Sequence, residues 1–432
     1  MQVGFIFPSS DYLHDPFRGD PHTYFQLLTV LENFNDQLSL KLIDLRGIDR
    51  KFAQYHIPEC EIYFYSLYTL DYEEIKGIVA ALRIRFPKSK HISGGPHATI
   101  YQEDSLKIFD TIITGEGENS IVKAIEDYPN LKTVYEEQNH IDINAYPFPK
   151  RHWLPVSTVS RIGLMTTKDK KHRDLLSCTV IFSRGCPYSC SFCALPTLKK
   201  FSPGIRYRKP ESIRAEIEYL QSDYGIEGIS LLDEIAIPLR RDDAIPHLEA
   251  IGRTGILWRG QTRVDGLNDE IVSLARKSGC ITMSLGIESV WQKSLDLINK
   301  RINIDMTRQS IKLLKKYGIE CRAYLVSGLP GEPEDIVERT LNFLDETQPD
   351  LALLSLFTVR PGTEVYNYPE HFGIKQVYSD WSKTMNLQDR YDEEEIKLTF
   401  EYDNGGFSKE RIISNFKELK SKITERGMSA VL

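Results

Sequence analysis

The first 130 residues alternate β-rich runs with segments of helical periodicity. Runs of β-branched and aromatic residues, bounded by polar, Gly or Pro residues, predict strands at residues 3–7, 40–45, 62–65, 91–93 and 111–114. Between the third and fourth runs, Ile75, Ile78, Val79 and Leu82 share one face of a helix. This order predicts an α/β domain with a doubly wound parallel sheet. Its ligands should bind beyond the carboxyl ends of the strands.

A second alternating series begins near residue 175. Its β-like runs lie at residues 176–182, 228–232, 257–263, 281–286, 321–326 and 351–357. Helical faces separate them, for example Ile213, Ile217 and Leu220, or Ile311, Leu313, Leu314 and Tyr317. Six βα units are too few for a closed eight-stranded barrel. They predict a partial (β/α)6 barrel with its chemistry in the loops at the carboxyl ends of the strands.

These patterns predict four parts of the chain. Residues 1–128 form the first domain, and 129–174, which carry several prolines and little periodicity, form a linker. Residues 175–367 form the partial barrel. Residues 368–432 form a short C-terminal accessory segment, with an acidic run at 392–395 and an amphipathic helix near 409–426.

Charge and composition narrow the possible partners. The 432 residues carry 54 Lys and Arg against 61 Asp and Glu, a net charge of −7, so no global positive field attracts nucleic acid. The longest apolar stretches fall short of the roughly 20 residues that a bilayer requires. We therefore expect a cytoplasmic protein without a transmembrane segment, acting on a small molecule or lipid. Three of the seven cysteines crowd into residues 186–193, which favours metal or redox chemistry over disulfides.

The cysteine cluster follows the first strand of the second series. It reads Ser183-Arg-Gly-Cys186-Pro-Tyr-Ser-Cys190-Ser-Phe-Cys193. Three thiolates at these spacings can hold a 4Fe–4S cluster and leave one iron open to another ligand. A structural zinc with Cys178 or His172 as the fourth ligand is the alternative. Zinc sites usually show two cysteine pairs, so the iron–sulfur interpretation is favoured.

The spacing C-x-x-x-C-x-aromatic-C, with Phe192 in the aromatic position, resembles the signature of the radical S-adenosylmethionine (SAM) superfamily. This resemblance implies that the amino and carboxylate groups of SAM fill the open iron position. It also implies reductive cleavage of SAM to a 5′-deoxyadenosyl radical. A low-potential electron donor such as flavodoxin or ferredoxin would then be a partner.

The resemblance also assigns SAM-binding roles at the strand ends. Glu288 of the GIES sequence would bind the ribose hydroxyls, and Gly328, Pro330 and Gly331 would form the turn against the adenine. Asp233 and Glu234 would lie near the amino group of the methionyl part of SAM, and Arg263 would contact its carboxylate. These last three residues could instead be solvated or salt-bridged strand ends. The predicted SAM-binding set is Phe192, Asp233, Glu234, Arg263, Glu288, Gly328, Pro330 and Gly331.

The loops of the first domain resemble those of the cobalamin-binding domain that precedes many radical SAM cores. The sequences GGPHAT and GEGEN carry this resemblance. It implies cobalamin binding by Pro8, Ser9, Ser66, Thr69, Gly94, Gly95, Pro96, His97, Gly115, Glu116, Gly117 and Glu118. A flavodoxin-like domain that has lost its ligand is the alternative. Asp11, His14 and Gly19 do not match the D-x-H-x-x-G spacing of a cobalt-ligating histidine, and His97 is expected to order its loop.

Together these resemblances imply cobalamin-dependent methylation of an unactivated carbon of a small molecule or lipid by a radical SAM enzyme. One alternative is radical cyclisation, rearrangement or C–C coupling without methyl transfer. A second alternative is a non-catalytic cobalamin or cluster sensor. The first domain contains only Cys60, so a single cluster is expected.

Overall fold

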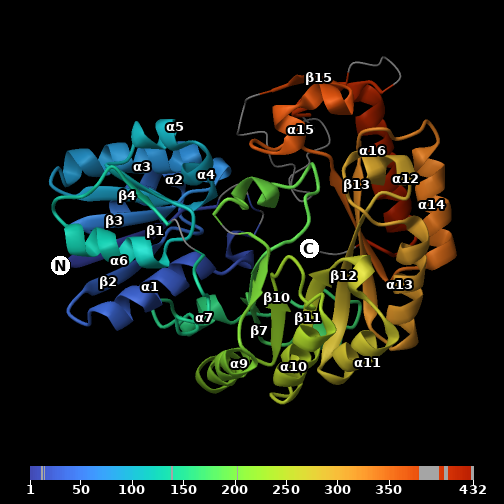
Figure 1. Cartoon of the computed structure of the whole chain (residues 1–432), viewed down its shortest axis with the longest axis horizontal. Coiled ribbons are helices and arrows are strands. Elements are labelled where there is room, and N and C mark those ends of the chain that lie inside the picture. Colours follow the sequence, from blue (N-terminus) through green and yellow to red (C-terminus); the bar gives the residue numbers. More distant parts are fainter. Residues whose placement is uncertain are drawn as a thin grey trace. The chain divides into compact units, whose positions relative to one another are not determined.

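The computed structural model describes residues 1–10, 13, 15–137, 140–201, 203–378, 398–402 and 407–429. The chain forms two compact units. The first comprises Met1–Val159 and Thr197–Pro203, and the second comprises Ser160–Pro196 and Gly204–Leu432 (Figure 1). These bounds differ from the predicted division at residues 128 and 175, because the first unit extends into the segment assigned to a linker.

The first unit contains a parallel sheet with the strand order β2-β1-β3-β4-β5-β6. Five of its strands were predicted. The sixth, β6, falls in the segment assigned to a linker, and with three residues it is too short for a hydrophobic pattern to reveal. The strands are β1 (Gln2–Phe7), β2 (Ser39–Asp44), β3 (Ile62–Ser66), β4 (Lys90–Gly94), β5 (Thr111–Thr114) and β6 (Val134–Glu136).

Helices cover both faces of this sheet (Figure 1). On one face, α1 (His22–Phe34) and α6 (Glu118–Asp127) bury Leu28 and Ile121 in a core with Phe5. On the other face, α3 (Tyr72–Arg85) buries its predicted apolar stripe. The shorter helices are α2 (Arg50–Ala53), α4 (Gly95–Ile100) and α5 (Gln102–Leu106). The strand order reverses between β1 and β3, and doubly wound sheets bind ligands at such a point.

The second unit contains a six-stranded parallel sheet with the order β14-β13-β12-β11-β10-β7. This confirms the predicted partial barrel. The strands are β7 (Ser177–Val180), β10 (Gly228–Leu231), β11 (Leu257–Thr262), β12 (Cys280–Glu288), β13 (Glu320–Ser327) and β14 (Leu351–Leu356). The helices between them are α9 (Pro210–Tyr224), α10 (Arg241–Gly252), α11 (Asp269–Lys277), α12 (Gln292–Leu297), α13 (Ile304–Lys316) and α14 (Ile336–Thr347).

A segment before β7 covers the amino end of this sheet. Arg259, near the start of β11, donates from Nε to the carbonyl of Leu164 at 2.8 Å. Arg322, near the start of β13, donates to Oγ1 of Thr166 at 2.8 Å. Met165 between them is fully buried. The carboxyl ends of the strands are therefore left for the site, as in other βα barrels.

Two antiparallel two-stranded sheets and a terminal helix complete the second unit. One sheet pairs β8 (Ser183–Gly185) with β9 (Ile205–Tyr207), and the other pairs β15 (Ile374–Val377) with β16 (Phe400–Tyr402). The predicted terminal helix is α16 (Lys409–Glu425), which packs against α14, β13 and β14. The acidic run at 392–395 lies outside the described residues.

Candidate active site

The three cysteines follow β7 and β8 at the carboxyl end of the sheet, and their thiols lie near enough to influence one another's pKa. Burial, together with the nearby Glu234, Cys190 and Cys186, raises the pKa of Cys193 to about 11. Burial also raises the pKa of Cys186, with Cys190 and Glu234 again contributing. A metal must therefore replace protons that these thiols hold tightly in the metal-free chain.

Two segments hold the middle of the cysteine loop. The carbonyl of Ile298, just after α12, accepts a hydrogen bond from the N–H of Ser191 at 2.9 Å. Asn299 donates from Nδ2 to the carbonyl of Ser189 at 2.8 Å. In addition, Ser191 donates from Oγ to Glu364, the first residue of α15 (Glu364–Asn367), at 2.7 Å. These bonds fix the backbone on both sides of Cys190.

Arg263, directly after β11, contacts the cysteine loop with part of its guanidinium. Its Nη1 lies 3.9 Å from the sulfur of Cys190, and its carbon lies 3.5 Å from the ring centre of Tyr188. It also pairs with Asp265 at 2.9 Å and donates to the carbonyl of Lys300 at 2.7 Å. With 5% of its surface exposed, Arg263 is a salt-bridged strand end. Its contact with SAM stays a prediction.

The adjacent acids Asp233 and Glu234 have different surroundings. Asp233 is buried and accepts hydrogen bonds from the N–H of Phe182 at 3.1 Å and from the hydroxyl of Ser183. Burial raises its pKa to about 6. Asp233 thus anchors the chain entering the cysteine loop. The side chain of Glu234 is exposed, but the surrounding protein removes part of its hydration and thereby raises its pKa. The positive charge of Arg360 lowers the pKa in part.

Glu288 and the glycine turn lie at the ends of β12 and β13. Glu288 has a left-handed φ of +62° and pairs with Lys300 at 2.6 Å. Gly328 and Gly331 have φ of +90° and +76°. A Cβ at these glycines would lie 2.8 Å from Ile412 and 2.5 Å from Leu297, respectively. The left-handed backbone therefore favours glycine at both positions. Pro330 is buried and Phe192 is half-buried.

The cysteine loop fits a 4Fe–4S cluster better than a single zinc ion. His172 pairs with Asp169 at 3.4 Å, and Cys178 is fully buried in β7. Among the described residues, no three His, Cys, Asp or Glu side chains surround one metal position. A cubane does not require such convergence, because each thiolate binds a different iron.

In the first unit, the predicted cobalamin-binding residues lie at the carboxyl edge of the sheet. Ser9 donates to Glu74 from its N–H and its hydroxyl, both at 2.8 Å. His97 is buried, and its Nδ1 lies 3.1 Å from Oγ1 of Thr69. Burial lowers the pKa of His97 to about 4, so the ring is neutral near pH 7. Its role in ordering the loop stays a prediction. Asp11 and His14 lie outside the described residues.

One threonine links the two glycine loops of this edge. Thr99 donates to the carbonyl of Gly95 at 2.9 Å and accepts from the N–H of Gly115 at 3.2 Å. Gly95 and Gly115 have left-handed φ of +89° and +80°, so both loops require glycine there. The other predicted residues of this edge are Pro8, Ser66, Gly94, Pro96, Glu116, Gly117 and Glu118.

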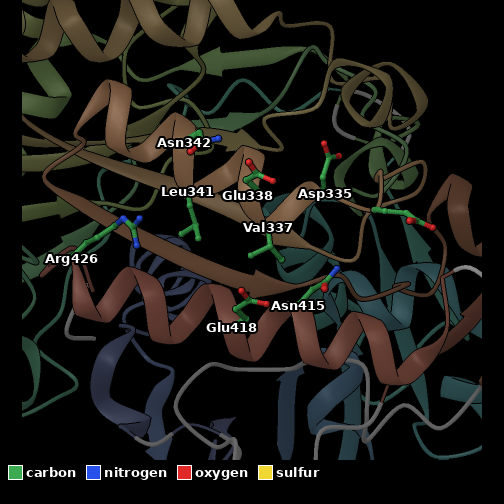
Figure 2. Close-up of a pocket in the computed structure, with 9 residues that line it drawn as sticks. Asp335, Val337, Glu338, Leu341, Asn342, Asn415, Glu418 and Arg426 are labelled. Carbon is green, nitrogen blue, oxygen red and sulfur yellow. The ribbon is translucent and has the colours of Figure 1, made fainter.

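Figure 2 shows a groove of about 460 Å³ between α14 and α16. It is lined by acidic side chains, including Glu338 and Glu418, and by Arg426. Arg426 also pairs with Asp345 at 2.7 Å. None of the predicted site residues lines this groove, so it is separate from the cysteine site.

Comparison with known proteins identifies the class of this site. Residues 180–344 match the radical SAM superfamily. An uncharacterised methyltransferase of Pyrococcus horikoshii is 28% identical over 299 residues, covering 64% of this chain and 62% of the relative. The anaerobic magnesium-protoporphyrin IX monomethyl ester cyclase of Rubrivivax gelatinosus is 29% identical over 311 residues, covering 68% and 55%. The matches thus span less than two thirds of these relatives.

A solved structure shares the fold of the whole chain. The radical SAM methyltransferase TsrM from Kitasatospora setae, solved with cobalamin and a 4Fe–4S cluster, superposes with a TM-score of 0.71 at 15% identity. The superposition covers 100% of this chain and 91% of TsrM. The cysteine loop and the matched residues define a radical SAM domain. Such a domain implies a 4Fe–4S cluster and SAM as cofactors.

Sequence reasoning did not find Lys300, Asn299 or Asp265. Lys300 and Asn299 belong to no motif, and they reach the site through contacts with residues that are distant in the sequence. Asp265 lies two residues after Arg263, so a charge pair across that strand end was the available signal. No helix in the described part of the chain is long and apolar enough to cross a membrane.

Proposed function

We propose that this protein is a cobalamin-dependent methyltransferase that methylates an unactivated carbon of a small molecule or lipid. The observation that carries the proposal is the pairing of two units in one chain. The first presents glycine loops at the carboxyl edge of a doubly wound sheet, and the second carries the cysteine loop. The whole-chain fold likeness to TsrM, which was solved with cobalamin, supports this pairing.

In the second unit, Cys186, Cys190 and Cys193 would hold the cluster. When bound, the cluster supplies the electron that cleaves SAM. Glu288 at the end of β12 would bind the ribose hydroxyls, for which a carboxylate is a suitable acceptor. Exposed Glu234, close to Cys186 and Cys193, would bind the methionyl amine. An external low-potential donor, a flavodoxin or ferredoxin, would provide the electron.

In the first unit, the loops after β3, β4 and β5 would hold cobalamin, which would serve as the methyl carrier when bound. Gly94 allows a clean test of this assignment. A Cβ there would approach no atom closer than 3.5 Å, so the fold accepts a side chain at this position. Gly95 offers no such test, because its Cβ would lie 2.8 Å from the backbone of Leu67.

We therefore expect Gly94→Leu to weaken cobalamin binding by about tenfold or more, because the leucine side chain would clash with a cofactor packed on this edge. Gly77→Leu is the matched control, since a Cβ on Gly77 in α3 meets nothing within 4 Å. Binding is measured by absorption titration with hydroxocobalamin. Equal affinities in both variants and the wild type would contradict this location.

A substrate-independent reaction tests methyl transfer itself. The anaerobically reconstituted protein, loaded with cobalamin and reduced, is mixed with SAM. We expect S-adenosylhomocysteine in an amount equal to the bound cobalamin, because each SAM molecule would donate its methyl group to one reduced cobalamin. Absence of S-adenosylhomocysteine, with 5′-deoxyadenosine still formed, would contradict methyl transfer.

That second outcome would favour another candidate, radical ring closure without methyl transfer. The specific observation for it is the similarity to the magnesium-protoporphyrin IX monomethyl ester cyclase. The two candidates share the cysteine loop and the SAM residues. They differ in whether the first unit serves as a methyl carrier.

A further inference from the structure

The segment from Ile298 to Arg301, which we call the brace, has an unusual backbone. Asn299 and Arg301 adopt left-handed φ of +53° and +56°. Residues other than glycine rarely adopt this conformation, and they persist in it where surrounding contacts determine the backbone. In the brace, these contacts are made with the cysteine loop and with Glu288.

The backbone of the brace contacts the cysteine loop and Arg263. Ile298 accepts from the N–H of Ser191, and the carbonyl of Lys300 accepts from Nη2 of Arg263 at 2.7 Å. Arg263 in turn lies 3.9 Å from the sulfur of Cys190. The main chain at Lys300 is thus tied to a predicted cluster ligand through one guanidinium.

The side chain of Lys300 points to a different part of the site. Its ammonium lies 2.6 Å from Oε1 of Glu288, and the two side chains are 8% and 13% exposed. Gly286 makes room for this pair, since a Cβ there would lie 2.9 Å from Oε1 and 3.0 Å from Nζ of Lys300. In the described part of the chain, Oε2 of Glu288 has no hydrogen-bond partner.

We propose that Lys300 is a positioning residue that orients the Glu288 carboxylate for the ribose of SAM and holds it in register with the cysteine loop. The ammonium engages one carboxylate oxygen, and the other oxygen stays available for a hydroxyl. The backbone carbonyl of Lys300 fixes Arg263 beside Cys190. This inference rests on the proposed role of Glu288 as the ribose ligand.

A merely structural ion pair would stabilise the fold without affecting ribose recognition. The experiment therefore compares the binding of SAM with that of its 2′-deoxy analogue to the cluster-reconstituted, unreduced protein by equilibrium dialysis. No turnover is needed. A hydrogen bond between a hydroxyl and an oriented carboxylate should make the wild type bind SAM about tenfold more tightly than the analogue.

We expect this preference to fall below about twofold in Lys300→Met, because the carboxylate loses its fixed orientation. Lys300→Arg should retain it, and Lys293→Met, which removes an exposed lysine of α12, is the matched control. Glu288→Gln should lose the preference as well, and adding Lys300→Met to it should have no further effect.

Retention of the wild-type preference in Lys300→Met would overturn the proposal. If Lys300→Met fails to hold a cluster, Lys300→Gln provides the same comparison. Absence of any preference in the wild type would overturn the ribose role of Glu288 together with the role of Lys300. Methyl transfer is scored separately, by S-adenosylhomocysteine, so failure of the two proposals can be told apart.

Discussion

Glu332 gives a pH-dependent prediction for the turn that follows β13. Its carboxylate is 9% exposed and accepts hydrogen bonds from the N–H groups of Gly328 and Leu329, each at 3.1 Å. Burial raises its pKa from 4.5 to about 8. Loss of water thus disfavours the charge more strongly than these hydrogen bonds and the Arg411 guanidinium favour it.

The sign of the effect follows from this raised pKa. Between the ordinary value of 4.5 and the folded value of about 8, the folded chain binds more protons than the unfolded chain. The contribution of Glu332 to stability is therefore complete below the ordinary value and is lost as the pH rises through the folded value. One pKa unit corresponds to about 1.4 kcal/mol. Raising the pH from about 6 to about 9 should then lower the free energy of unfolding by about 2 to 3 kcal/mol.

The substitution Glu332→Gln removes this titration and keeps the size of the side chain. We measure urea unfolding of the metal-free wild type and variant at several pH values. The difference in unfolding free energy should move in favour of the variant by about 2 to 3 kcal/mol across that range. Glu338→Gln, at an exposed position of α14, is the control and should show no such trend. If the difference in unfolding free energy between the wild type and Glu332→Gln did not change with pH, the idea that burial raises the pKa of this carboxylate would be refuted.

Two further predictions concern backbone conformation and a buried charge. Gly331→Ala should destabilise the metal-free protein by about 1 to 3 kcal/mol, because Gly331 has a φ of +76° that alanine adopts only with strain. Gly77→Ala, within α3, should stabilise the protein by about 0.5 to 1 kcal/mol. Equal melting temperatures of the two variants would contradict this prediction. Arg151→Met should cost about 3 to 5 kcal/mol in urea unfolding, because it leaves the buried Asp20, now 3.0 Å from the guanidinium, without that partner. A loss below about 1 kcal/mol, as for an exposed pair, would count against it.

Hydrophobic pattern predicted the large sheets, because most of their strands are largely buried apolar runs. Strands β1, β3 and β12 show this pattern clearly, whereas β2 is mostly half-buried. The strands that it missed, β6, β8, β9, β15 and β16, have three or four residues each. Strands β5, β7 and β10 are equally short, but all their residues are buried and apolar runs reveal them. The missed strands include exposed or half-buried positions, so pairing with a neighbour decides their structure.

The candidate site divides in the same way. The cysteines were singled out because their spacing is itself the chemical signal, and Glu288 because its GIES sequence resembles that of radical SAM proteins. The roles of these residues stay predictions. Lys300 was not predictable, since its role depends on Glu288 twelve positions earlier and on Arg263, 37 positions earlier. Arg263 was expected to meet SAM, and the structure shows it engaged with Asp265, Tyr188 and Lys300.

The central claim is that Cys186, Cys190 and Cys193 hold a cluster that cleaves SAM. The most direct measurement is the amount of 5′-deoxyadenosine formed when the anaerobically reconstituted protein is reduced in the presence of SAM, normalised to bound iron. We expect about four irons per chain and 5′-deoxyadenosine in the wild type and in Cys60→Ala, and neither in Cys190→Ala. A wild-type protein that holds a single zinc ion at this loop, or holds iron and leaves SAM intact, would contradict the account.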